Sequence, residues 1–121
     1  MIPSLIVALD SYAWLALVHG YTRDELTTGE LQACLDLAET LATSPADEPA
    51  ALFFALAKPP GSRSEAWPRF PRVMGRNHAH NSGFFLVTSD EELEDLAWHI
   101  CLEGRTYEHV RDWFRKRLRP R

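Results

Sequence analysis

The chain has 121 residues, of which 45% are hydrophobic and 25% are charged. This length supports one domain, and this balance excludes a disordered, collagen-like or repeat protein. No apolar run approaches the ~20 residues of a membrane-spanning helix, and the first residues lack the basic segment of a secretory signal. We therefore expect a single cytoplasmic domain, 1–121, that has no membrane partner.

The net charge of −4 averages over strongly segregated blocks. Residues 1–57 and 90–103 carry net charges of −7 and −6, whereas residues 58–89 and 104–121 carry +4 and +5. Such blocks either neutralise one another within the fold or present opposed faces to a partner. The negative total argues against tight, general nucleic-acid binding but leaves room for a local basic surface.

The first half of the chain predicts one strand followed by helices. Residues 5–9 are a short apolar run with β-branched members, which favours a buried strand over the start of a buried helix. Asp10 or Ser11 then caps a helix over residues 12–19, which has no polar face and is expected to be deeply packed. Thr27 or Thr28 opens a clearer helix that runs to about Leu41.

The second half predicts one more strand and two capped helices. Residues 50–58 are apolar throughout, and the pattern leaves helix and strand open there. Residues 59–82 show no sustained periodicity and predict a long, basic, proline-rich loop. Residues 84–87 predict a strand. Ser89 and Glu92 form a capping box for a helix that Gly104 ends, and Thr106 caps a last helix through Leu118.

Both predicted strands run into an acidic residue at the start of a helix. These residues are Asp10 and Asp90. In an open parallel sheet, ligands bind beyond the carboxyl ends of the strands, so the two carboxylates would face one crevice. Paired carboxylates there could hold Mg²⁺ or Mn²⁺, which activates a water against a phosphodiester. The competing interpretation is that each Asp is an ordinary helix cap.

Two segments resemble a nuclease family. Leu9-Asp10-Ser11-Tyr12-Ala13-Trp14-Leu15-Ala16-Leu17 resembles the opening of PIN-domain ribonucleases, and Gly83-Phe84-Phe85-Leu86-Val87-Thr88-Ser89-Asp90 resembles a later strand of that family. The resemblance implies an α/β/α fold, metal-dependent RNA cleavage and, for toxin members, an antitoxin partner. It implies that Asp10 and Asp90 bind the metal and that Glu39, or else Glu30, is the mid-chain catalytic acid. At the position where the family pattern has a further acid, this chain has Arg72.

A different set of segments resembles a second family. Residues 50–58, 91–104 and the closing helix through Trp113 are similar in order and spacing to Fic/Doc proteins, which are all-helical nucleotide-dependent transferases or kinases. Their phosphate-binding loop has the form His-Pro-Phe-x-x-Gly-Asn-x-Arg, of which this chain keeps only the fragment Asn77-His78-Ala79 followed by Gly83. This resemblance implies an all-α fold with a dead or remodelled nucleotide site.

The predicted loop has the composition of a binding surface. Cations suit phosphates, aromatic faces suit base stacking, and the same side chains anchor many protein interfaces. The candidate residues for RNA or partner binding are Arg63, Trp67, Arg69, Phe70, Arg72 and Arg76. His78 and His80 have a spacing that zinc sites use on a strand, although a pair in a polar loop is more often solvated.

The sequence thus predicts a small, helix-rich α/β domain with two or three parallel strands, the alternative being an all-α, Fic/Doc-like fold. The predicted function is a PIN-like, Mg²⁺- or Mn²⁺-dependent ribonuclease or a degenerate relative in a toxin–antitoxin pair. One alternative is a non-catalytic protein-interaction module, such as an antitoxin, immunity or phage partner protein, with a homodimer as one arrangement. A further alternative is a Fic/Doc-like protein with a degenerate nucleotide site.

Overall fold

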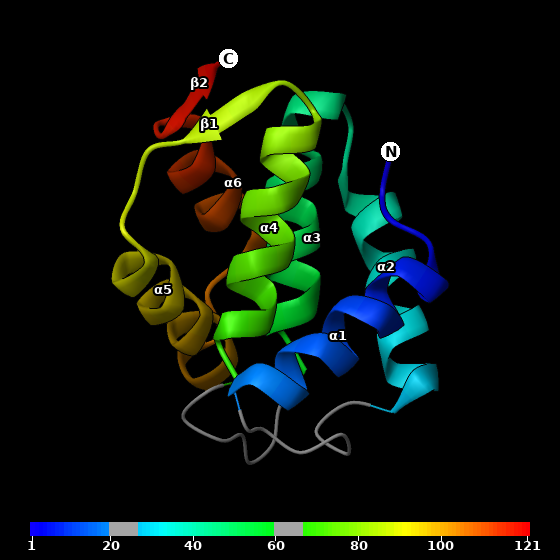
Figure 1. Cartoon of the computed structure of the whole chain (residues 1–121). Coiled ribbons are helices and arrows are strands. Elements are labelled where there is room, and N and C mark those ends of the chain that lie inside the picture. Colours follow the sequence, from blue (N-terminus) through cyan, green and yellow to red (C-terminus); the bar gives the residue numbers. More distant parts are fainter. Residues whose placement is uncertain (20–26, 60–66) are drawn as a thin grey trace.

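Helices dominate the computed structural model, which describes residues 1–19, 27–59 and 67–121. The elements are α1 (Leu5–His19), α2 (Thr28–Leu41), a 3₁₀ turn η1 (Pro45–Asp47), α3 (Glu48–Ala57), α4 (Arg69–Asn81), β1 (Phe84–Leu86), α5 (Asp90–Glu103), α6 (Tyr107–Arg115) and β2 (Leu118–Pro120) (Figure 1). None of the helices in these ranges is long and apolar enough to cross a lipid bilayer.

The predicted parallel sheet is wrong. The described ranges contain one sheet, in which β1 and β2 pair antiparallel and Phe85 lies opposite Arg119. Residues 5–9, predicted as a strand, are the first turns of α1. Ser4 precedes that helix, and its Oγ accepts a hydrogen bond from the Val7 N–H at 3.4 Å; the helix runs through Asp10 without interruption. A short apolar run has no period of its own, so it fits a buried strand and a helix equally well.

Three predicted helices are confirmed at their starts by their caps, although the last ends at Arg115 and the predicted end, Leu118, lies in β2. The side chains of Thr27, Ser89 and Thr106 each accept a hydrogen bond from the backbone N–H three residues later, which opens α2, α5 and α6. Gly104 ends α5 in the left-handed conformation, at φ 70°. These signals are local because a cap needs only a few neighbouring residues, and they were therefore readable from the sequence.

The predicted loop over residues 59–82 is corrected in its second part, where residues 69–81 form α4. Its prolines, Pro68 and Pro71, lie at the helix start, where a backbone N–H has no partner within the helix. The buried face of α4 follows helical spacing at Phe70, Met74 and His78. Gly75 allows close contact with α3, since a Cβ there would lie 3.3 Å from the Phe53 side chain.

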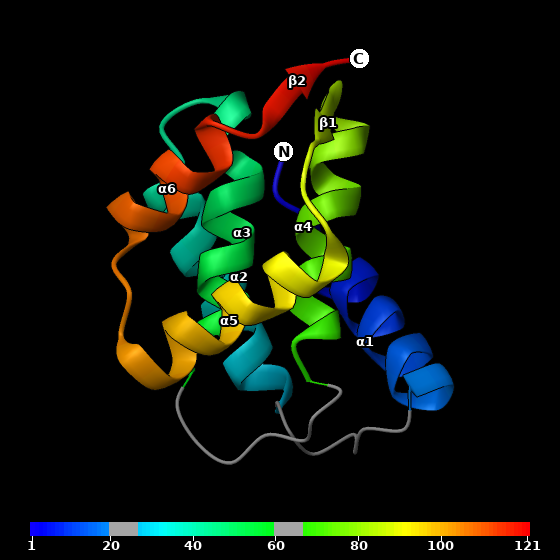
Figure 2. The same ribbon diagram turned by 90° about the vertical axis from the view of Figure 1, so that its left-hand side faces the viewer.

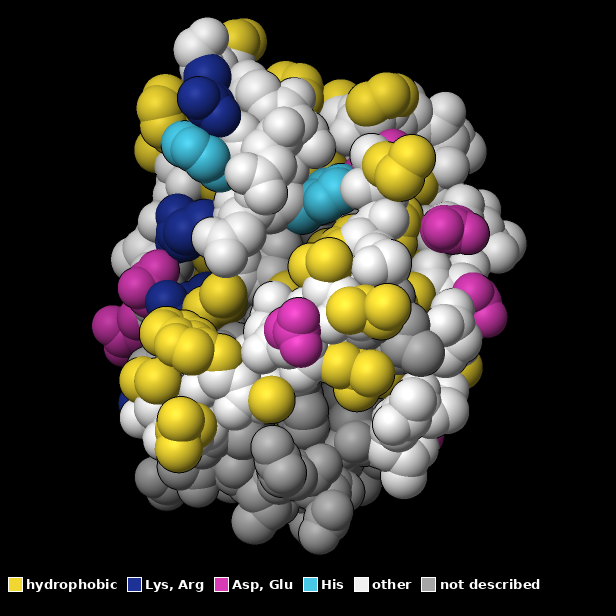
Figure 3. All heavy atoms as spheres, turned by 45° about the vertical axis from the view of Figure 1, so that its right-hand side comes forward, with side chains coloured by type: hydrophobic (Ala, Val, Ile, Leu, Met, Phe, Trp, Pro, Cys, Tyr) yellow, Lys and Arg dark blue, Asp and Glu magenta, His cyan; other side chains and the backbone are white. Residues whose placement is uncertain are grey.

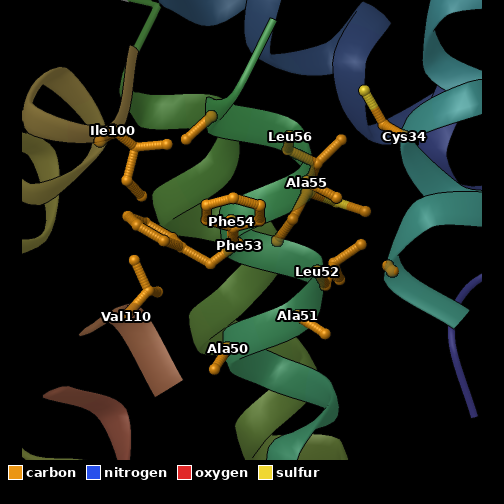
Figure 4. Packing of buried hydrophobic residues seen from close by; sticks show 14 of the residues in the cluster. Cys34, Ala50, Ala51, Leu52, Phe53, Phe54, Ala55, Leu56, Ile100 and Val110 are labelled. Carbon is orange, nitrogen blue, oxygen red and sulfur yellow. The ribbon is translucent and has the colours of Figure 1, made fainter. Parts of the chain in front are cut away.

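Helix α3 is the centre of the fold, with α2, α4, α5 and α6 packed around it (Figures 1 and 2). Every residue from Pro49 to Ala57 is buried. The Phe53 ring lies 5.3 Å from that of Phe114 on α6, and the Phe54 ring lies 5.7 Å from that of Tyr107. Figure 4 shows these side chains radiating from α3 toward its neighbours. The helix-or-strand question over residues 50–58 is thus answered as helix.

Candidate interaction surface

The predicted metal-binding carboxylates do not form the expected cluster. Asp10 is exposed in the middle of α1, and Asp90 is the first residue of α5. Helix α4 lies between α1 and α5 (Figures 1 and 2). Glu39 is exposed on α2, and Glu30 accepts a hydrogen bond from the cap Thr27 at 3.2 Å. Within the described ranges, no three His, Cys, Asp or Glu side chains come together as a metal site.

Asp90 is instead bound to arginines of α4. Its carboxylate accepts from Arg72 at 2.9 Å and from Arg76 at 3.0 Å, and Arg72 also reaches Glu94 at 2.9 Å. Arg76 further donates to the backbone carbonyls of Leu86 and Thr88. Two of the predicted RNA-binding cations therefore hold the connection from β1 to α5 against α4.

The predicted aromatic contacts of the basic segment are corrected as well. Trp67 and Phe70 have no exposed surface, and the Trp67 ring packs 5.7 Å from that of Trp98. Phe70 belongs to the core because α4 packs against α3 and α5, and Trp67, in the turn before α4, packs on α5 through Trp98. Arg69 is half-buried, and Arg63 lies outside the described residues.

The charge blocks neutralise one another at two places in the fold. The first is the cluster of Arg72 and Arg76 with Asp90, which joins the second and third blocks. The second is a two-pronged contact in which Arg115 donates to both oxygens of Asp47, at 3.0 and 2.7 Å. The hydrogen bond from Arg115 holds the pKa of the buried Asp47 below its usual range, although burial opposes it. These pairs support the fold rather than a free basic surface.

His78 and His80 do not share a face, because they lie two residues apart on a helix rather than a strand. His78 is buried, and its Nε2 lies 2.9 Å from Oε1 of Glu48, whereas His80 is exposed near the Phe85 ring. Burial raises the pKa of Glu48, but hydrogen bonds from the N-terminal ammonium and His78 outweigh it and lower the pKa overall. The predicted zinc pair therefore becomes one structural histidine and one surface histidine.

The most unusual surface feature of the described residues is a group of exposed apolar side chains on α1. Five large apolar side chains of this helix are more than half exposed, from 52% at Val7 to 85% at Leu17; they are Ile6, Val7, Trp14, Leu17 and Val18. Asp10 lies among them, and together the six residues are called the α1 face here. Helix α1 contacts α2 and α4 with its other side, where Ala8 is fully buried. Figure 3 shows hydrophobic side chains over this part of the molecule.

A groove adjoins the α1 face where α1 meets α4. It has a volume of about 340 Å³ and is lined by Met1, Pro3, Val7, Ser11, Met74, Asn77, His78, Asn81 and Ser82. Val7 thus belongs both to the face and to the groove. Polar and apolar residues line this groove in similar numbers, so it is not an apolar pocket.

The α1 face was missed because a helix without a polar face predicts deep burial. The structure buries one side of α1 and leaves Trp14, Leu17 and Val18 exposed. One signal was available: Asp10 has helical spacing to Ile6, Trp14 and Leu17, and a charge at that spacing marks a side that faces water. No family model, curated protein or solved structure matches the chain.

Proposed function

We propose that the protein is a non-catalytic protein-interaction module whose partner binds the α1 face. The observation that carries this is an apolar helix side with five exposed side chains and one charge. Monomeric proteins rarely expose contiguous apolar patches above a few hundred Å², and larger ones usually mark binding sites. The Trp14 side chain is of the kind that anchors protein interfaces, since it contributes a large area at little entropic cost.

The rest of the described surface offers less to a catalytic function. The carboxylates of the ribonuclease hypothesis lie on separate helices, and the arginines near Asp90 are already paired. The ribonuclease activity itself stays a prediction, but the parallel strands on which its geometry rested are replaced by helix α1 and an antiparallel ribbon. The interaction hypothesis needs no such site.

The experiment is site-specific photocrosslinking in an extract of the source cells. The photoreactive residue benzoylphenylalanine replaces Ile6, Trp14 or Leu17 on the α1 face, and Glu91, exposed on α5, is the control position. We expect the same adduct from all three face positions and none from position 91. Mass spectrometry identifies the adduct as a second copy or as a different protein. No shared adduct across the face positions would contradict the proposed function.

A second candidate is the Fic/Doc-like protein with a degenerate nucleotide site. The observation that favours it is the helical packing of α3 with α5 and α6, in the order that the resemblance implies. Without the phosphate-binding loop, such a protein would keep only its binding surfaces, so the two candidates are compatible. Calorimetric titration with ATP tests the nucleotide site. Saturable binding of about one ATP per chain would favour a remodelled site, whereas no heat of binding would favour a dead one.

A further inference from the structure

The positions of the α1 face are symmetric along the helix. Residues 6, 7, 10, 14, 17 and 18 point outward, and reversing the helix about residue 12 maps this set onto itself. Ile6 then lies opposite Val18, Val7 opposite Leu17, and Asp10 opposite Trp14. In an antiparallel pair of identical helices, residue i contacts j while j contacts i, so a set of positions of this kind pairs with itself.

Val7 and Leu17 lie at equal distances from the centre of the face. Leu17 is the most exposed of these side chains at 85%, and Val7 is 52% exposed. The two positions are ten residues apart, which is about 15 Å along a helix. An antiparallel second copy would bring its own Leu17 level with Val7, and the same contact would form a second time across the axis.

The charge on the face is compatible with a second copy. Antiparallel packing puts Asp10 level with Trp14, so the two Asp10 carboxylates are offset by about 6 Å along the helix axis in addition to the separation of the helices. Helix α1 contains no Lys or Arg. Helices that lie on anionic membranes usually carry several basic residues on the polar side, so this face suits a protein better than a lipid surface.

The area is close to what a dimer needs. From their exposed fractions, the five apolar side chains present roughly 600 Å² per chain, against about 800 Å² per partner in a standard interface. Two such faces together would bury roughly 1,200 Å², which is at the lower end of the range for a specific interface.

We propose that a second copy of this chain covers the α1 face, through antiparallel packing of α1 against α1 about a two-fold axis near residue 12. This inference rests on the proposed function and names its partner. The contact of Leu17 with Val7 of the second copy, formed twice, lies on either side of the axis.

Sedimentation equilibrium of the full chain, at about 5 to 200 μM, tests the dimer. We expect the wild type to reach the mass of two chains, and Leu17→Asp to weaken association ~100-fold, because it puts a carboxylate into a buried contact. Leu102→Asp is the matched control, since Leu102 is 72% exposed on α5. The control should associate like the wild type. A wild type that stays monomeric, or a control that dissociates as much as Leu17→Asp, would overturn the proposal.

Crosslinking tests the direction of packing. Val7→Cys and Leu17→Cys chains, each carrying Cys101→Ser to remove the partly exposed native thiol, are mixed and treated with a short bismaleimide. Antiparallel packing predicts that the mixed 7-to-17 product forms faster than either symmetric product. Faster crosslinking of Leu17→Cys to itself would show parallel packing and would overturn the proposed interface.

The two proposals fail in different ways. If the wild type is monomeric but photocrosslinking at positions 6, 14 and 17 captures a different protein, the homodimer is wrong and the interaction module stands. If neither a second copy nor another protein is captured, both are wrong. Binding of the wild type to lipid vesicles that Leu17→Asp abolishes would assign the face to a membrane instead, and would also overturn the homodimer.

Discussion

Helices α1 and α3 have similarly apolar sequences but differ in how far they are buried. Each has almost no polar side, yet α3 is buried over all of Pro49 to Ala57, whereas α1 leaves five large apolar side chains more than half exposed. Helix α3 is surrounded by four other helices, while α1 is covered by α2 and α4 from one side. An all-apolar helix is expected to be buried all round. The difference teaches that an apolar sequence does not by itself bury a helix: among the described elements, α2 and α4 pack against α1 while its opposite side stays exposed.

The most direct test of this difference in burial is to make the same substitution, Leu→Ala, in both helices. Leu52→Ala in α3, where the side chain has no exposed surface, should lower the free energy of unfolding by about 2–5 kcal/mol, because it leaves a cavity. Leu17→Ala in α1 should change it by less than about 0.5 kcal/mol. Urea denaturation at a protein concentration low enough to keep the chain monomeric measures both. Equal losses would mean that α1 is packed as fully as α3.

The next largest effect is expected where α3 and α4 approach each other. Gly75→Val puts a branched side chain at a position where even a Cβ lies 3.3 Å from Phe53, so it should cost roughly 1–3 kcal/mol of stability. Gly29→Val is the control, because a Cβ at Gly29 meets only the Thr27 hydroxyl at 4.0 Å. Thermal unfolding compares the two, and a control as damaging as Gly75→Val would refute close packing as the cause.

A smaller effect should appear where α3 begins, at the pair of Asp47 with Arg115. Asp47→Asn should cost roughly 1–2 kcal/mol at pH 7, since it weakens two charge-assisted hydrogen bonds. The pKa of Asp47 is lowered in the fold, so its contribution is present above the unfolded pKa of about 3.9 and is lost as the pH falls through the folded value. Thermal midpoints between pH 7 and pH 2 should therefore fall in acid for the wild type and less steeply for Asp47→Asn. A fall that is equally steep in the variant would assign the acid sensitivity to other carboxylates.

The smallest effect is expected from Asp10 on the exposed side of α1. Asp10→Asn should leave the thermal midpoint within about 2 °C, since the carboxylate is exposed and surface changes rarely exceed ~0.5 kcal/mol. Self-association should tighten a few-fold, because two like charges leave the interface. A Mg²⁺- or Mn²⁺-dependent RNA cleavage that Asp10→Asn abolishes would instead support the ribonuclease hypothesis and contradict the interaction module.

The candidate site was harder to predict than the helices around it. Asp10 was predicted to be a metal ligand at a strand end, whereas the structure places it as the one charge on an exposed apolar helix face. Trp67 and Phe70 looked like binding residues because they lie among arginines, whereas both are buried in the core, Trp67 just before α4 and Phe70 in its first turn. In each case the sequence showed the residue type but not the direction in which its side chain points, because that direction depends on where the neighbouring helices lie.

The sequence by itself determined the helices that begin and end with local signals. Thr27, Ser89, Thr106 and Gly104 act on backbone groups a few residues away, so their effect does not depend on the rest of the fold. Only the tertiary structure decided that residues 5–9 join a helix, that Leu118–Pro120 pairs with β1, and which side of α1 stays open. The burial of a segment depends on the elements that pack against it, and the sequence of the segment itself does not specify which elements these are.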